Sequence, residues 1–262
     1  MAGTCSYRLL THHVDLDLPD GSTPARAYLA NTAVQDVPCR HRVRYAVTPA
    51  AGRLVLREDG DRFADAASMD EAARLLDERL RLRVCDYLSR AGWLLLAAGL
   101  VTVGDRRCLV VGDDVDRSVL LAALLLDGHR VDGAEVVAVR GGDAVAVPFP
   151  LRLGVAVLDR VPELAAVWDR FPVVGTDAPV RVVDPPTLGV EWRVMRAPVE
   201  AVAVLDDGGT PAIATVLEAR SGPSVLPPGA EVREAAMVLG TGSTHRVPAS
   251  VEGAALLRDA LG

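Results

Sequence analysis

The sequence contains no lysine: all 28 of its Lys and Arg residues are arginine. This absence excludes chemistry that needs a lysine amine, such as a Schiff base with a carbonyl substrate or the phosphate-binding lysine of a P-loop. A genome rich in G and C accounts for the bias without any function. The absence nevertheless restricts the enzyme classes to which the chain can belong.

Long apolar runs and an excess of positive charge are also missing. The longest apolar run, Trp93 to Val103, is well below the roughly 20 residues that a membrane-spanning helix requires. The net charge of −7 and the pI near 5.3 argue against a nucleic-acid partner or an anionic membrane surface. Because the first residues also lack the apolar core of a signal peptide, we expect a cytoplasmic protein.

Cysteine is scarce, and no two of the four cysteines have Cys-x-x-Cys spacing. This pattern favours buried, reduced thiols, in agreement with a cytoplasmic protein. His12, His13 and His41 lie in ordinary strand and turn sequence. We therefore expect no metal site there.

Of the 262 residues, half are hydrophobic but only 4% are aromatic, so valine, leucine and alanine must fill the core. Residues 1–65 consist mainly of short β-like segments separated by turn signals. Ser68 and Glu71 then form a capping box, which predicts a helix from 68 to about 90. We expect one unit over residues 1–90, a β-rich module with this capped helix, and a second unit over residues 91–262.

The stretch 92–153 predicts an α/β core. Two continuous apolar runs, 94–103 and 108–111, predict strands buried on both faces, and the apolar block up to Leu126 predicts a helix over 118–126. A buried strand is expected over 131–139, and 136–147 should form a hairpin. Further on, we expect a loop-rich region over 206–247 and a helix from Ser250 to Leu261.

A strand, a glycine-led loop and a buried helix form the frame of a P-loop, but this loop has different chemistry. Gly112 is followed by only three residues before Asp116, Arg117 and Ser118. Asp116 thus replaces the second glycine of the Walker pattern, Arg117 replaces its lysine, and one residue is missing.

Carboxylates surround the position at which a P-loop binds phosphate, namely those of Asp113, Asp114 and Asp116. Each contact between like charges near 4 Å costs roughly 1–4 kcal/mol, so a triphosphate is disfavoured. We expect the carboxylates to cap the helix at 118, with Asp116 closest to its start. A Mg²⁺ or Ca²⁺ site is the alternative, although the spacing is not that of a calcium loop.

The span 92–153 and its flanks resemble the HPr-kinase-like P-loop family, in the shorter branch associated with ribosomally synthesised, modified peptides. The similarity rests on 92–101 (Gly-Trp-Leu-Leu-Leu-Ala-Ala-Gly-Leu-Val), 108–112 (Cys-Leu-Val-Val-Gly), 147–150 (Val-Pro-Phe-Pro) and 197–205. It implies an α/β, P-loop kinase-like core, with the β-rich module and capped helix as its N-terminal extension.

The departures lie at the positions that carry chemistry in that family. Ala97 stands where the family has a histidine, Arg117 where it has the P-loop lysine, and Ala134 where it has the first of two Walker-B-like acids. Of that pair only Glu135 remains, and Ser118 alone keeps its residue type in the loop. The resemblance thus implies a degenerate P-loop, for which we expect no catalytic residue, no cofactor and no metal.

Two functions follow from this resemblance. The first is a non-catalytic, pseudokinase-like accessory protein that binds a precursor peptide or a partner enzyme through the β-rich module and helix 68–90, alone or as a homo- or hetero-oligomer. The alternative is a divergent ATP-dependent kinase acting on a Ser or Thr of a peptide or protein, with Arg117 in place of lysine and Glu135 or Asp132 as base.

A third reading, an unrelated hydrolase or transferase, finds little support. The sequence has no Gly-x-Ser-x-Gly elbow, and Ser243-Thr244-His245 is expected to be a loop.

Overall fold

The computed structural model describes residues 3–20, 22, 29, 33–174, 179–205, 210–222 and 225–262. Their strands are β1 (Gly3–Leu9), β2 (His12–Leu18), β3 (Val34–Gln35), β4 (His41–Ala50), β5 (Arg53–Glu58), β6 (Asp61–Ala66), β7 (Leu94–Leu96), β8 (Ala98–Val103), β9 (Arg106–Gly112), β10 (Arg130–Gly133), β11 (Val137–Arg140), β12 (Asp143–Ala146), β13 (Leu151–Leu153), β14 (Val173–Val174), β15 (Val180–Val183), β16 (Arg193–Val194), β17 (Ala197–Pro198), β18 (Ala201–Leu205) and β19 (Ser243–Arg246). The α-helices are α2 (Met69–Arg90), α3 (Asp114–Leu126), α4 (Ala212–Glu218), α5 (Ala230–Gly240) and α6 (Val251–Leu261).

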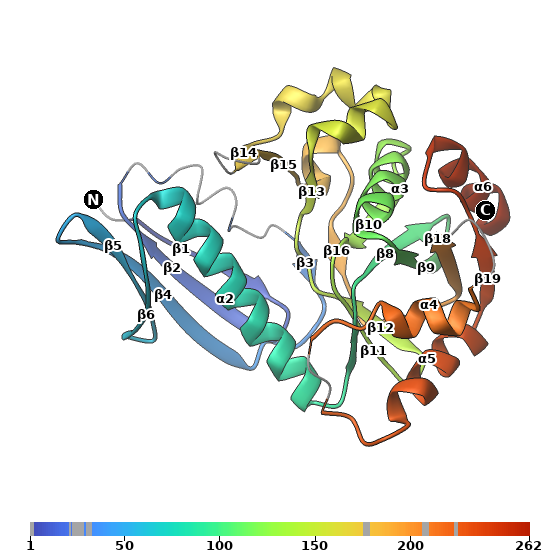
Figure 1. Ribbon diagram of the computed structural model, residues 1–262, viewed down its shortest axis with the longest axis horizontal. Coiled ribbons are helices and arrows are strands. Elements are labelled where there is room, and N and C mark those ends of the chain that lie inside the picture. The colour runs from blue at the N-terminus through green and yellow to red at the C-terminus, as the bar shows by residue number, and fades with distance from the viewer. Residues whose placement is uncertain are drawn as a thin grey trace.

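The N-terminal part is a five-stranded sheet, in the order β1-β2-β4-β5-β6, with the long helix α2 lying across it (Figure 1). The predicted capping box is present: Ser68 Oγ accepts from the Glu71 amide at 3.2 Å, and the Glu71 carboxylate accepts from the amide of Ala67 at 2.7 Å. The apolar stripe of α2 packs into a cluster with the inner face of this sheet. The prediction of a β-rich module with a capped helix is confirmed.

The second half of the chain contains two further large sheets, besides the three-stranded sheet β13-β15-β14 and strand β16, which pairs with β3. One has the order β10-β8-β9-β18-β19, in which β9, β18 and β19 run parallel and β8 runs antiparallel to β9. The other has the order β17-β12-β11-β7. The strands β7, β8 and the central part of β9 are buried along their length, as their continuous apolar runs predict. The protein is mixed α/β.

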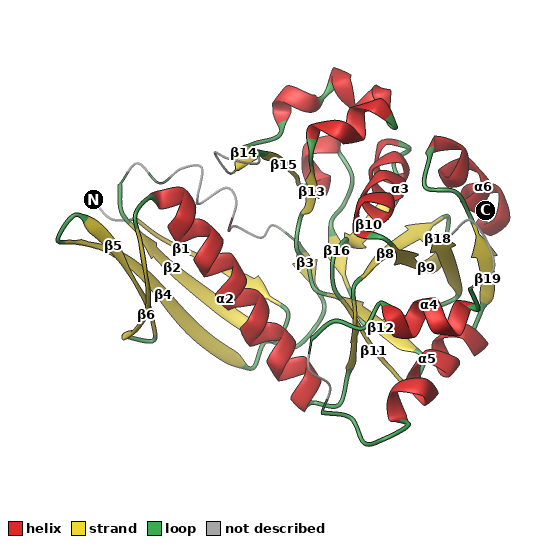
Figure 2. Cartoon of the chain, viewed as in Figure 1, coloured by secondary structure: helices red, strands yellow, loops and turns green. Residues whose placement is uncertain are grey.

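The three large sheets, which contain β4, β9 and β11, are arranged in layers. Helices α3 and α6 cover one face of the β9 sheet, while α4 and α5 pack near its other face, next to the β11 sheet (Figure 2). Strands β11 and β12 have apolar side chains on both faces: Val137 and Val139 point toward the β9 sheet, whereas Ala138 and Val145 join the cluster that contains α2. The β11 sheet is therefore the layer that the N-terminal module and the rest of the chain share.

Four predicted boundaries are wrong. The strand expected over 94–103 is divided at Ala97 into β7 and β8, which belong to different sheets. Helix α3 begins at Asp114 and not at residue 118, because Asp113 is its N-cap. The strand expected over 131–139 is divided into β10 and β11, which belong to different sheets. The stretch predicted to be loop-rich, 206–247, contains α4, α5 and β19 among its described residues.

The helix capped by Ser250, by contrast, is found as predicted, and so is the hairpin of β11 and β12. Among the described residues, no helix combines the length and the apolar character needed to cross a membrane.

The shared hydrophobic cluster predicts that residues 1–90 and 91–262 unfold together. Deleting 1–66 would expose buried side chains on both sides of this cluster, among them Leu76, Val145 and Phe149. Urea transitions followed by far-UV circular dichroism and by tryptophan fluorescence should therefore coincide, and the truncated chain should not fold. Two separate transitions would mean that the N-terminal module is an independent unit.

Candidate functional site

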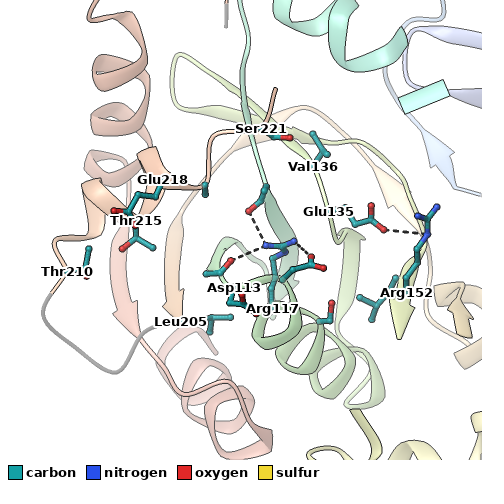
Figure 3. Close-up of a pocket in the computed structure, with 16 residues that line it drawn as sticks. Asp113, Arg117, Glu135, Val136, Arg152, Leu205, Thr210, Thr215, Glu218 and Ser221 are labelled. Carbon is teal, nitrogen blue, oxygen red and sulfur yellow. Dashed lines mark hydrogen bonds and ion pairs between the residues drawn. The ribbon is translucent and has the colours of Figure 1, made fainter. Parts of the chain in front are cut away.

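A cavity of about 750 Å³ lies where β9 passes into α3, at the loop that the sequence singles out (Figure 3). Its floor is the loop itself and its walls come from the β10–β11 connection, β13 and α4. The lining residues are Ala97, Gly112, Asp113, Asp114, Arg117, Ser118, Glu135, Val136, Leu151, Arg152, Leu205, Thr210, Thr215, Glu218, Ala219 and Ser221. The loop residues singled out from the sequence thus lie around one cavity, except Asp116.

Arg117, the residue in the place of a P-loop lysine, points into the protein. Its side chain is only 4% exposed. The guanidinium donates to the carbonyl oxygens of Ala134 at 3.0 Å and of Ala97 and Gly112 at 3.1 Å each, and it also pairs with the Asp114 carboxylate. Burial lowers the pKa of Arg117, while Asp114 acts in the opposite direction. The guanidinium of Arg117 is thus hydrogen-bonded to the protein's own backbone.

Two of these carbonyls belong to Ala97 and Ala134, which the sequence singles out as departures from the pattern that it resembles. The structure brings both of them to Arg117. Three residues that are far apart in sequence therefore form one contact.

Gly112 has a structural reason to be glycine that does not involve phosphate. Its φ is +151°, and a Cβ at this position would lie 2.6 Å from Cβ and 3.0 Å from the carbonyl oxygen of Leu205. Strand β18 passes too close to the end of β9 to allow a side chain. The glycine is explained by strand packing.

The acidic residues of the loop have separate roles. Asp113 caps α3, since its Oδ1 accepts from the amide of Val115 at 2.9 Å. Asp114 pairs with Arg117, and Asp116, one turn further on, pairs with Arg160 at 2.7 Å. The expectation that carboxylates cap the helix is confirmed, but Asp113 is the capping residue and the choice of Asp116 is wrong.

Glu135 is also held by arginines. Its carboxylate pairs with Arg81 of α2 and lies 3.7 Å from Nε of Arg152. Both arginines in turn contact Asp77, at 2.8 and 2.6 Å. This network of two acids and two bases joins α2 to the wall of the cavity.

Asp132, the other carboxylate considered as a base, is fully buried between Arg107 and Arg130. Burial raises its pKa, and the two arginines act in the opposite direction. It does not line the cavity. Its ion pair with Arg107 joins β10 to β9, and Arg130 in turn donates to Thr102 of β8 at 2.8 Å.

The cavity is acidic where a P-loop would be positive. Its charged lining residues are four acids and two arginines, and both arginines are ion-paired. Within the described part of the chain, Asp113 and Glu218 form no ion pair. Figure 3 shows Glu218 and Thr215 of α4 on the side of the cavity opposite Glu135 and Arg152.

A second cavity, also of about 750 Å³, lies beside α2, between this helix and residues of β2 and β4, and was not predicted from the sequence. It is lined by His12, His41, Glu58, Arg79, Arg81, Leu82, Arg83, Cys85, Asp86, Tyr87, Ser89, Arg90, Leu95, Val136, Ser221 and Gly222. Val136 and Ser221 line both cavities. Leu82 could have indicated this cavity from the sequence, because it lies outside the apolar stripe of α2. In the structure it is 57% exposed.

At one end of this cavity three rings pack together. His12 and His41 face each other across β2 and β4 with centroids 5.2 Å apart, and Tyr87 of α2 lies 4.7 Å from His41. Burial lowers the pKa of His12 to about 4, with His41 contributing to the shift, so His12 is neutral near pH 7. Among the described residues, no three His, Cys, Asp or Glu side chains are placed to hold a metal ion.

Ser243 and His245, expected in a loop, lie on β19, with Oγ and Nε2 2.6 Å apart. Arg106 donates to the same Oγ at 3.2 Å. The described residues place no carboxylate on the histidine, and neither residue lines one of the two cavities. Ser243 and His245 are two residues apart on one strand, so their side chains lie on the same face, and this accounts for their contact.

The capping geometry predicts how the loop acids contribute to stability. Asp113→Ala should lower the free energy of unfolding by about 0.5–2 kcal/mol, whereas Asp113→Asn should cost only a few tenths, since asparagine caps equally well. Asp116→Ala removes a half-exposed ion pair and should cost about 0–1 kcal/mol. Urea unfolding of the three variants measures this order, and a larger loss in Asp116→Ala would contradict the assignment of the cap.

Arg117 should matter for stability more than any other loop residue. Arg117→Ala leaves three backbone carbonyls without their donor and should cost about 2–4 kcal/mol. Arg117→Lys should recover only part of this, because an ammonium cannot reproduce the planar fork that spans the carbonyls. The measurement is urea unfolding, and an Arg117→Ala variant as stable as wild type would show that the guanidinium is not structural.

Comparison with known proteins assigns no family: no protein-family model matches the chain, and no curated protein matches its sequence.

Proposed function

We propose that the chain is a non-catalytic, HPr-kinase-like accessory protein that binds a peptide or a partner protein. The observation that carries this proposal is the position of Arg117, the only cation of the loop, whose donors are directed at three backbone carbonyls and at Asp114. The order β9, glycine-led loop, α3, with β18 parallel to β9, supports a P-loop-like frame. The chemistry of that frame is absent from the loop.

Electrostatics at the α3 N-terminus supports the same conclusion. In a P-loop, free amides at the helix start and a lysine attract phosphate. Here the Asp113 carboxylate already accepts from the amide of Val115. A triphosphate would also meet the exposed Asp114, and each like-charge contact near 4 Å costs roughly 1–4 kcal/mol at a protein surface. The protein's own carboxylates take the place of the anion.

The alternative, a divergent kinase, would need a free base and a phosphate-binding cation. Glu135 is engaged by Arg81 and approached by Arg152. Asp132 lies away from the cavity, between two arginines. Neither carboxylate is placed to accept a proton from a substrate hydroxyl in the cavity. The arrangement therefore favours binding over phosphoryl transfer.

The proposed ligand class comes from the resemblance and from the cavities. The HPr-kinase-like branch that the sequence resembles is associated with ribosomally synthesised, modified peptides, so a precursor peptide or the enzyme that modifies it is the proposed partner. Two neighbouring cavities of about 750 Å³ each offer more volume than a single small ligand needs. One of them lies along α2, the helix that is predicted from the sequence to contribute to the partner surface.

The proposal predicts that nucleotides do not bind. Neither ATP nor GTP, with or without Mg²⁺, should raise the Tm, whereas a ligand at about 100 times its Kd stabilises by roughly 2.7 kcal/mol. Thermal unfolding in each nucleotide measures this. Asp113→Asn is the matched control, because it removes a repelling charge while keeping the cap, and it should not bind nucleotide either. A magnesium-dependent rise in Tm that is lost in Glu135→Gln would support the kinase alternative.

A further inference from the structure

The cavity at the β9–α3 loop (the loop cavity) and the cavity along α2 (the helix cavity) meet at Val136 and Ser221, which line both. At this border the backbone is already paired: Ser221 donates its amide to the carbonyl of Leu95 at 2.9 Å, next to the bridge between Leu96 and Arg220. The border between the cavities is therefore held by backbone hydrogen bonds. The two adjacent cavities are together called the groove, which extends from α3 to α2.

The two halves of this groove have opposite charge preferences. In the loop cavity the unpaired charges are negative, those of Asp113 and Glu218. The helix cavity has four arginines and two acids in its lining. Both acids are ion-paired with arginines of the same lining, Glu58 with Arg79 and Arg83 and Asp86 with Arg90, so this cavity has no unpaired carboxylate for a cation. A cation is therefore favoured in the loop cavity and disfavoured in the helix cavity.

The helix cavity also offers apolar surface. Leu82 is 57% exposed, and Leu95, Val136 and the ring of Tyr87 contribute to the same lining. A neutral His12 adds a further ring, as its lowered pKa implies. An exposed leucine beside aromatic and aliphatic side chains is suited to an apolar side chain of a ligand.

A single small molecule would have to combine an apolar part and a cation at a distance, whereas a peptide carries both on neighbouring residues. We infer that this groove binds an extended segment of a partner peptide, with an apolar side chain in the helix cavity and an arginine or lysine side chain in the loop cavity. The inference rests on the proposed function, of which it specifies the ligand. The position of the basic residue fixes the direction of the peptide along the groove.

The experiment selects ligands from a phage-displayed library of random peptides on the immobilised full-length chain. Enriched peptides should share one Arg or Lys at a fixed spacing from an apolar or aromatic residue. A fluorescein-labelled copy of the most enriched peptide then serves as the probe in fluorescence anisotropy. Its affinity should fall with rising salt, as expected for a cation held by carboxylates.

Isosteric variants test the loop cavity. The double variant Asp113→Asn, Glu218→Gln removes both unpaired charges while keeping the helix cap, and should weaken the probe about tenfold. Glu218→Gln alone, at the end of α4, should weaken it about threefold and keeps the test valid if the double variant is unstable. The matched control is Asp105→Asn, Glu163→Gln, two exposed acids outside the groove, which should bind within about twofold of wild type.

Leu82→Ser tests the helix cavity and should weaken the probe about fivefold. Its control is Leu256→Ser on α6, since Leu256 is 54% exposed and lies outside the groove. A probe that binds the groove variants and the controls equally would overturn the groove while leaving peptide binding intact. Enrichment of acidic peptides without a basic residue would also overturn it. A library that yields no enriched peptide would overturn the inference, but not the binding of a partner protein that the proposed function also includes.

Discussion

One buried guanidinium joins the parts of the chain on which the layered fold depends. Ala97 lies where the chain leaves β7 in one sheet and enters β8 in another, and Ala134 lies where it returns from β10 to β11. Arg117, from α3, donates to the carbonyls of both residues and to that of Gly112 at the end of β9. Residues at a sheet crossover have no strand partner for all of their backbone groups, so a side chain must satisfy them. Arginine is suited to this role because its planar fork carries five donors.

This use of arginine also accounts for the acidic character of the loop. A guanidinium that is 4% exposed requires a nearby negative charge, and Asp114 supplies it. The start of α3 requires an acceptor, which Asp113 supplies. Asp113 and Asp114 thus stabilise the loop from within, one at the helix start and one at the guanidinium. The buried arginine and the neighbouring acids are two parts of one structural arrangement.

The sequence predicted those elements that depend on local signals. The α2 and α6 helices have serine caps, and β11 and β12 flank a Gly-Gly turn, so neighbouring residues alone indicate their ends. The division of 131–139 between two sheets could not be predicted, because a buried apolar run does not specify which sheet it joins. The start of α3 was ambiguous for another reason: Asp113, Asp114 and Asp116 are all competent caps, and the length of the loop decides among them.

The candidate site was found only in part, because its main contacts involve the backbone. A carbonyl oxygen has no sequence signature, so the partners of Arg117 could not be read from residue types. The helix cavity was missed because it forms between α2 and strands β2 and β4, which are far apart along the chain. Only the exposed Leu82 and the arginines of α2 pointed to that face.

The ion pair between Arg81 and Glu135 connects the two cavities physically. Arg81 lines the helix cavity, Glu135 lines the loop cavity, and each is also tied to Asp77 or Arg152. A cation that approaches Glu135 competes with Arg81 for the same carboxylate. Arg81 would then interact more strongly with a negative group in the helix cavity, since buried charges are poorly screened. The same ion pair that holds α2 against the core therefore lies between the two halves of the groove.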